Sequence, residues 1–230
     1  MAWTVYPHGT LKQLSPMIWH LEGALPKMAL KRSMVIIKDK RGLTVHNAIA
    51  CKADTMQQID KIGDVHSIIF PNAMHRMDGG AFAERYPNAR LYAPLASLSA
   101  AQKKSPREVY ALSELQSEVL ETESVEGAGE KESIFKVSDD DGLTLIFNDA
   151  LFNHPHVAGF GGWVLRALGS SGGPRVTPLA KLLLIKDRKR FNDQLERLAN
   201  LPDLKRAIPG HGDVIEKNVQ EVLLGVAGRL

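Results

Sequence analysis

Cysteine is almost absent from this sequence, in which Cys51 is the single example among 230 residues. One thiol cannot form an internal disulfide framework or a metal knuckle built from paired cysteines, and this usage is typical of a reducing compartment. We therefore expect a cytoplasmic protein in which Cys51 is a small buried residue. The eight histidines and the carboxylates are then the residues suited to binding a metal.

Long apolar runs and an excess of charge of one sign are also missing. The longest uncharged stretches, such as Val157–Leu165, fall well short of the roughly 20 residues that a membrane span needs. The formal net charge is +3, from 29 Lys and Arg against 26 Asp and Glu. The sequence therefore predicts no membrane partner and no nucleic-acid partner, and its N-terminus lacks the pattern of a signal peptide.

Apolar runs with the periods of strands and helices alternate along the first half of the chain. The runs 33–38 and 43–49 flank a turn and predict a hairpin, and Ala53–Ile62 has helical spacing. Strands are expected at 66–70 and 90–93, with a helix at 79–86 between them. This order predicts an α/β fold with right-handed crossovers.

The second half is more varied. Between Ala111 and Asp141 the sequence has ten acidic and two basic residues, which we interpret as a solvated antiparallel hairpin over 118–123 and 133–137. A strand at 143–147, a glycine-rich loop at 155–178 containing a short helix, a helix at 187–200, a short strand at 206–208 and a helix after 213 follow. We expect one domain over residues 1–230, with residues 1–32 as an irregular N-terminal extension.

Polar residues follow three of the predicted strands, where open α/β sheets place their sites. These loops are FPNAMHRMDGG (70–80), FNDALFNHPH (147–156) and IPGHGD (208–213). They contain His75, Arg76, Asp78, Asp149 and His211. Three of these have a simpler interpretation, because Asp149 could cap a turn and the two histidines could be turn or surface residues.

The order and spacing of these motifs resemble the metallo-β-lactamase fold superfamily. The strand TLIFNDALF resembles the one that carries that superfamily's metal-bridging aspartate, and AIPGHGDVI resembles its final histidine motif. The tracts FPNAMHRMDGGAFAERYPNARLYAP and NDALFNH resemble an uncharacterised bacterial branch whose first motif is altered. The resemblance covers about residues 33–215 and implies a four-layer αββα sandwich.

The ligand motifs of active members are incomplete here. Aligning Gly79-Gly80 with the glycines that follow the His-x-His-x-Asp-His motif places Asn72, Met74, Arg76 and Met77 at its ligand positions. The segment 126–129 holds no histidine where the next ligand is expected. A two-metal centre needs more ligands than remain, so the resemblance implies a depleted site.

The resemblance leaves three functions open. The first is a divergent hydrolase-like protein, non-catalytic or with one divalent ion (Zn, Mn or Fe) on Asp149, His211 and His75, in which Asp78 assists and Arg76 holds an anionic small-molecule ligand. The second is a metal-free protein that binds a small anion or acts as a scaffold. The third is a metallohydrolase that recruits His154 or His156. The basic cluster around Lys186–Arg190 is expected to be a solvated helix face.

Overall fold

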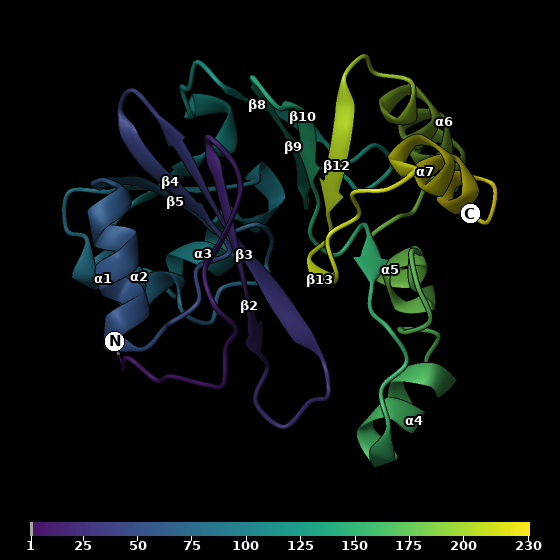
Figure 1. The fold of residues 1–230 in the computed structure, drawn as a ribbon, viewed down its shortest axis with the longest axis horizontal. Helices are drawn as coiled ribbons and strands as arrows, with labels where there is room; N and C mark the ends of the chain where they lie inside the picture. Colours follow the sequence, from purple (N-terminus) through teal and green to yellow (C-terminus); the bar gives the residue numbers. More distant parts are fainter. Residues whose placement is uncertain (1) are drawn as a thin grey trace.

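Two β-sheets pack face to face in the computed structural model, and helices cover the outer side of each sheet (Figure 1). The structure describes residues 2–230. The larger sheet has the order β1 (Lys12–Ser15), β2 (Ile18–Ala24), β3 (Lys31–Asp39), β4 (Gly42–His46), β5 (Val65–Ile69), β6 (Arg90–Ala93) and β7 (Val109–Ala111). The smaller sheet has the order β12 (Leu204–Ile208), β10 (Gly142–Ile146), β9 (Ser133–Asp139) and β8 (Leu120–Ser124).

The helices and a short strand pair complete a four-layer αββα sandwich. The helices are α1 (Ala53–Ile62), α2 (Gly79–Arg85), α3 (Leu98–Gln102), α4 (Gly159–Ala167), α5 (Pro178–Leu183), α6 (Arg188–Ala199) and α7 (Val219–Ala227). Two 3-10 turns lie at Leu95–Ser97 and Leu112–Glu114, and β11 (Phe152–Asn153) pairs in parallel with β13 (His211–Gly212). No helix in the described part of the chain is both long enough and apolar enough to cross a membrane.

The N-terminal residues, expected to be irregular, instead supply two strands of the larger sheet. β2 pairs along its whole length with β3, from Ile18 opposite Ile37 to Ala24 opposite Lys31. Ile18 and Leu21 are fully buried, so the segment contributes to two apolar layers. β2 was not predicted because apolar and polar residues alternate only weakly along it, where His20, Glu22 and Gly23 lie. A strand of this kind is stabilised by its pairing with β3.

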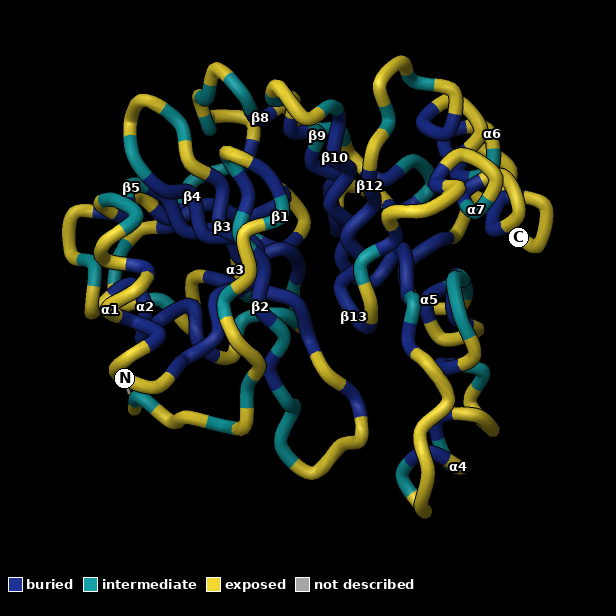
Figure 2. The backbone as a smooth tube through the Cα atoms, viewed as in Figure 1, coloured by how far each residue is buried: buried dark blue, intermediate teal, exposed yellow. Residues whose placement is uncertain are grey.

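Three apolar clusters fill the spaces between the four layers. Between the sheets lie side chains such as Val35 and Ile69 from the larger sheet and Phe135 and Ile146 from the smaller one. A second cluster joins the larger sheet to α1 and α2, and a third joins the smaller sheet to α6 and α7. Figure 2 shows the strands of both sheets as mostly buried. Strands buried on both faces explain the near-continuous apolar runs in the sequence.

Two close backbone approaches fix the loops that leave the sheets. A Cβ atom at Gly79 would lie 2.3 Å from Cε1 of Phe70, and one at Gly210 would lie 2.6 Å from the carbonyl carbon of Asn148. Only glycine fits positions where the backbone is approached this closely. The glycines of the first and third loops therefore hold these loops against the ends of β5 and β10.

Candidate metal centre

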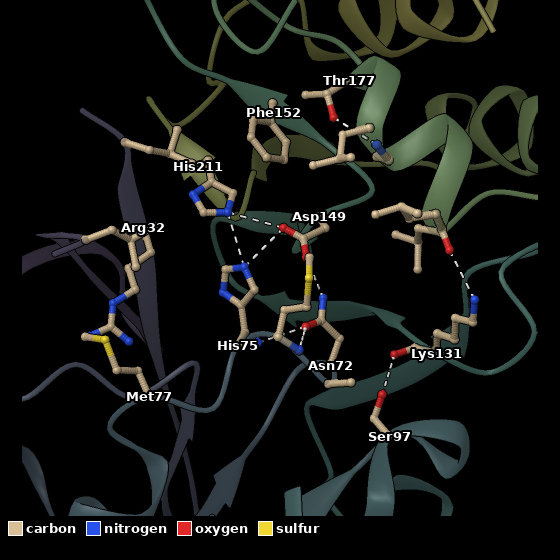
Figure 3. A pocket seen from close by; sticks show the side chains of 18 of the residues that line it. Arg32, Asn72, His75, Met77, Ser97, Lys131, Asp149, Phe152, Thr177 and His211 are labelled. Carbon is tan, nitrogen blue, oxygen red and sulfur yellow. Dashed lines mark hydrogen bonds and ion pairs between the residues drawn. The ribbon is translucent and has the colours of Figure 1, made fainter. Parts of the chain in front are cut away.

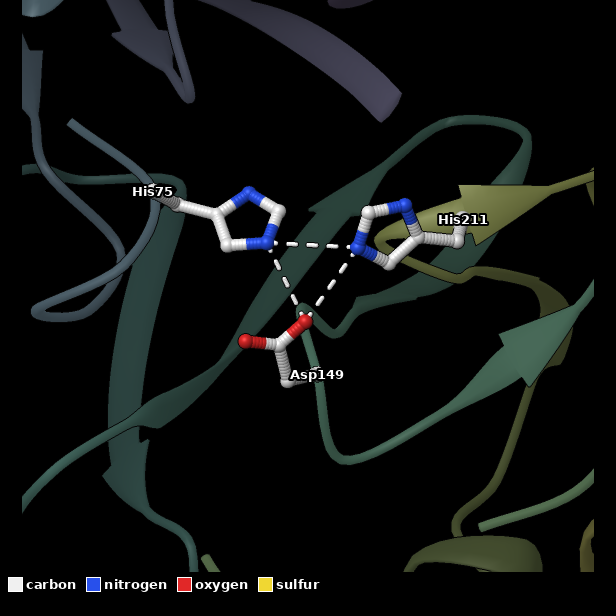
Figure 4. Close-up of side chains that lie close together, drawn as sticks. All are labelled: His75, Asp149 and His211. Carbon is white, nitrogen blue, oxygen red and sulfur yellow. Dashed lines mark hydrogen bonds and ion pairs between the residues drawn. The ribbon is translucent and has the colours of Figure 1, made fainter. Parts of the chain in front are cut away.

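The loops after β5, β10 and β12 bring His75, Asp149 and His211 together at one end of the sandwich (Figure 4). Nε2 of His75 lies 3.1 Å from Oδ1 of Asp149, Nε2 of His211 lies 3.2 Å from the same oxygen, and the two nitrogens are 3.2 Å apart. The sequence predicted these three as the ligands of one ion. The structure meets the geometric condition for that prediction, because the three could hold a single metal ion.

Each imidazole is anchored through its other nitrogen. Nδ1 of His211 lies 2.6 Å from the carbonyl oxygen of Lys31, so this nitrogen carries the proton and donates it. Nδ1 of His75 faces Oδ1 of Asn47 at a longer 3.4 Å, and the amide of Asn47 donates to the carbonyl of Ser33. Histidines that bind metals commonly donate their second N–H in this way. Both Nε2 atoms are consequently directed at Asp149.

Asp149 is positioned by an amide and by a second carboxylate. Its Oδ2 accepts a hydrogen bond from Nδ2 of Asn72 at 2.7 Å, and the same amide group lies 3.1 Å from Oε2 of Glu132. Glu132, which is fully buried, also accepts the backbone N–H groups of Asn148, Asp149 and Ala150. Glu132 therefore organises the turn that presents Asp149 to the two histidines.

Burial and mutual charge set the protonation of this group. Burial would raise the pKa of the Asp149 carboxyl, but His75 and His211 outweigh it and hold that pKa well below its usual range. Burial and then the charge of Asp149 raise the pKa of Glu132 to about 7. Burial lowers the pKa of His211, whereas the neighbouring carboxylates overcome burial and raise the pKa of His75. Asp149 is thus ionised at neutral pH and suited to a cation.

A cavity of about 470 Å³ opens in front of the three side chains (Figure 3). Its walls are predominantly aliphatic, and they come from the β2–β3 loop, the β5–α2 loop, β11 and α5. The apolar lining residues are Leu25, Met28, Leu30, Ala73, Met74, Met77, Ala96, Phe152, Leu179, Ala180, Leu183 and Leu184. The cavity is large enough for a small organic molecule, which it would contact mainly through apolar side chains.

The basic side chains near the cavity already have hydrogen-bond or ion-pair partners within the protein. The Arg76 guanidinium donates to the carbonyl oxygens of Ala73 and Ala100, and Arg76 is not among the residues that line the cavity. Arg32 does line it, but its guanidinium forms a buried ion pair with Asp78. Nζ of Lys131 lies 3.1 Å from the carbonyl oxygen of Leu183. The structure thus gives Arg76 a loop-bracing position rather than the anion-binding one expected from the sequence.

Asp78 also lies apart from the three converging side chains. Its Oδ2 pairs with Arg32 and accepts the backbone N–H of Ala50 at 2.9 Å. The carboxylate joins the start of α2 to β3 and to the loop after β4. This placement favours a structural role for Asp78 over the assisting role expected from the sequence.

The remaining histidines of the second loop point elsewhere. Nδ1 of His154 lies 2.8 Å from the carbonyl oxygen of Pro155, and Nδ1 of His156 lies 2.9 Å from Oγ of Ser171. Neither residue lines the cavity. Cys51 is buried as expected, and burial raises the pKa of its thiol to about 12, which makes it unreactive at neutral pH.

Sequence reasoning missed the groups that support the three side chains. Asn72 stood out only as a poor metal ligand, and nothing distinguished Glu132 from the other acidic residues around it. Asn47 fell inside the apolar run 43–49, whereas in the structure it follows the end of β4 in a left-handed conformation with φ of 56°. The contacts through which these residues support the site join positions 14 to 77 residues apart in the sequence.

Known structures share this architecture. A metallo-β-lactamase from Pontibacter korlensis superposes with a TM-score of 0.61 at 13% identity, covering 96% of this chain and 99% of the other. DIM-1 metallo-β-lactamase exposed to ceftazidime gives 0.64 at 12% identity, covering 98% and 99%. The mono-zinc form of FIM-1 from Pseudomonas aeruginosa gives 0.59 at 14% identity, covering 99% and 98%.

The chain has the metallo-β-lactamase fold. The superpositions span nearly the whole length of both chains, which agrees with the αββα sandwich that the sequence predicted. No protein-family model and no curated protein sequence matches the chain. At these identities the likeness establishes the metallo-β-lactamase fold alone, and the function must be argued from the site.

Proposed function

We propose that the chain is a metal-dependent hydrolase that uses a single divalent ion held by His75, Asp149 and His211. The spacing of the three ligand atoms is the main support for this proposal. In a tetrahedral zinc site, neighbouring ligand atoms lie about 3.3–3.5 Å apart, given bonds of about 2.0–2.2 Å. The corresponding separations of 3.1, 3.2 and 3.2 Å lie within a few tenths of an ångström of that triangle. The side chains would need little movement to hold an ion.

The donor set suits Zn²⁺ first, with Mn²⁺ or Fe²⁺ as alternatives. Two imidazole nitrogens and one carboxylate oxygen are borderline donors, and three protein ligands leave a position open for water or substrate. When bound, the ion would supply a more acidic water molecule and a Lewis acid for a carbonyl or similar group. Within residues 2–230 these three form the one such group of possible ligands, which supports a mononuclear site.

The chain's own residues would orient the ligands and bind the substrate. The carbonyl of Lys31 fixes the tautomer of His211, and Asn72 fixes the rotation of the Asp149 carboxylate. The aliphatic walls of the cavity would exclude water and hold the apolar part of the substrate. Because Arg32 and Arg76 are engaged in internal contacts, an uncharged apolar molecule fits this cavity better than a small anion.

Two observations support a metal-free binding function as an alternative. Nε2–H of His75 can donate to Oδ1 of Asp149 at 3.1 Å, so these two side chains can be held together by a hydrogen bond without an ion. Met74 and Met77, which occupy two positions of the first ligand motif, line the cavity as apolar residues. Both features would suit a metal-free protein that binds a small apolar molecule.

Hydrolysis of chromogenic esters by metal-loaded protein distinguishes these functions. Protein without an affinity tag would be loaded with Zn²⁺ or Mn²⁺ and assayed with p-nitrophenyl esters from acetate to octanoate. We expect turnover that Asp149→Ala or His211→Ala lowers at least 100-fold, and that His156→Ala, which removes a histidine outside the cavity, leaves unchanged. Saturable ester binding with no metal uptake and no turnover would support the metal-free alternative instead.

A further inference from the structure

Helices α4 and α5 present large apolar side chains to solvent. Phe160 and Trp163 of α4 are 81% and 64% exposed, and their rings stack with centroids 6.0 Å apart. Leu182 of α5 is 71% exposed, and Leu179 and Leu183 are more than half exposed. Isolated exposed leucines are ordinary, whereas a cluster of two aromatics with several leucines marks an interaction surface.

The end of α4 lies close to the start of α5 at the edge of the molecule (Figure 1). A Cβ atom at Gly169, just after α4, would lie 3.0 Å from the ring of Pro178 at the start of α5. Figure 1 shows α4 projecting away from both sheets, and Figure 2 shows many exposed residues along this segment. A projecting helix with exposed rings can insert into a soft surface without the rest of the fold obstructing it.

The segment of the chain that contains these two helices is strongly basic. Residues 154–190 include seven basic residues, Arg166, Arg175, Lys181, Lys186, Arg188, Lys189 and Arg190, and one acidic residue, Asp187. Within residues 2–230, the side chains of Arg166, Lys186 and Arg188 have no hydrogen-bond or ion-pair partner. The segment therefore has a net charge of about +6, and three of its cations are free to meet an anionic surface.

We propose that the α4–α5 surface, defined by Phe160, Trp163, Leu179, Leu182 and Leu183 with the surrounding cations, binds the surface of anionic phospholipid bilayers. Exposed aromatic and leucine side chains flanked by arginine and lysine are what a helix lying in the bilayer interface requires. Residues 2–230 contain no helix that could span a membrane, but a helix that lies in the bilayer interface needs only one apolar face.

A second copy of the chain fits this surface less well. A two-fold symmetric contact places the same surface on both subunits, so each basic segment would face its own copy. Like charges brought together in this way oppose association. Phospholipids with acidic headgroups offer the opposite charge together with an apolar layer for the rings.

The surface also adjoins the mouth of the cavity. Leu179 and Leu183 of α5 are exposed and line the cavity as well, as does Met28 of the β2–β3 loop. α4 touches that loop, because a Cβ atom at Gly161 would lie 2.8 Å from Cβ of Ala29. The apolar side chains of the α4–α5 surface are thus continuous with the apolar lining of the cavity. Membrane binding itself does not depend on the proposed hydrolase activity.

Co-sedimentation with vesicles tests the proposal. Vesicles of phosphatidylcholine with about a third phosphatidylserine would be compared with phosphatidylcholine alone. We expect the wild-type protein to bind the anionic vesicles at least 10-fold more tightly, and to lose most of this binding in 0.5 M salt because salt screens surface charge. Phe160→Ser with Trp163→Ser should weaken binding at least 10-fold, and Arg166→Glu with Lys186→Glu should do so independently.

The matched control is Leu224→Ser, which removes an exposed leucine from α7, far from α4 in Figure 1. It should bind vesicles like the wild type. The proposal is overturned if the wild type does not bind anionic vesicles, or if neither double variant weakens binding. It is also overturned if light scattering shows a wild-type dimer that Phe160→Ser with Trp163→Ser converts to monomer, because that result assigns the surface to a second copy.

Discussion

Nδ1 of His211 donates to the carbonyl oxygen of Lys31, 180 residues earlier in the chain, across 2.6 Å. Lys31 begins β3 of the larger sheet, and His211 lies in β13 after the last strand of the smaller one. This bond joins the two sheets and leaves Nε2 of His211 available to a ligand. The site is therefore a property of the packed sandwich, and it exists only when both sheets are docked.

Asn72→Ala should weaken metal binding without removing a ligand. The side chain donates to Asp149 at 2.7 Å, so its loss frees the carboxylate to rotate away from the two imidazoles. Substitutions of such supporting groups typically lower metal affinity about 10–100-fold. Titration calorimetry with Zn²⁺ would measure the change, with Asn88→Ala, at an exposed asparagine, as the control. An affinity equal to that of the wild type would show that Asn72 does not position Asp149.

Asp78→Asn should destabilise the fold by about 3–5 kcal/mol, because it leaves the Arg32 guanidinium buried without its counter-charge. The two side chains are only 2% and 6% exposed. Urea unfolding followed by circular dichroism would measure the loss. A matched control is Asp60→Asn, which breaks the half-exposed pair with Arg85 and should cost less than about 1 kcal/mol. Equal effects of the two substitutions would contradict the structural role given to Asp78.

Glu123→Gln should lower stability at neutral pH, and this effect should become much smaller as the pH falls to 2. Burial would raise the pKa of Glu123, but hydrogen bonds from Arg197, Lys136 and Gln194 lower it to about 2. A carboxyl whose pKa falls on folding stabilises the protein above its unfolded value of 4.5, and this contribution is lost as the pH falls toward 2. Thermal unfolding of both proteins between pH 2 and 7 would measure it. A stability difference that stays constant over this range would contradict the assignment.

Much of the fold could be predicted because its elements carry strong local patterns. The helix expected at 53–62 is α1, and the hairpin expected over 33–49 is β3 and β4. Strand-end loops in an α/β sheet meet at one edge, and the resemblance of TLIFNDALF and AIPGHGDVI to two ligand motifs paired Asp149 with His211. His75 was one of two candidates in its loop, and only the packed structure directs its ring toward Asp149.

The supporting contacts could not be predicted because they join distant segments. Asp78 and Arg32 are separated by 46 residues, and Asn72 and Asp149 by 77. The apolar lining of the cavity could not be predicted for the same reason, because its residues come from segments that are far apart in the sequence. Arg76 was expected to face a ligand because of its place in the motif, but backbone carbonyls nearby satisfy its guanidinium.

The metal content of the protein tests the central claim most directly. Tag-free protein would be incubated with excess Zn²⁺, passed through a desalting column and measured by plasma mass spectrometry, beside Asp149→Ala, His211→Ala and the His156→Ala control. We expect about one zinc ion per chain in the wild type and the control, and less than a tenth of that in the other two variants. Zinc-free wild-type protein, or equal zinc in all four, would contradict it.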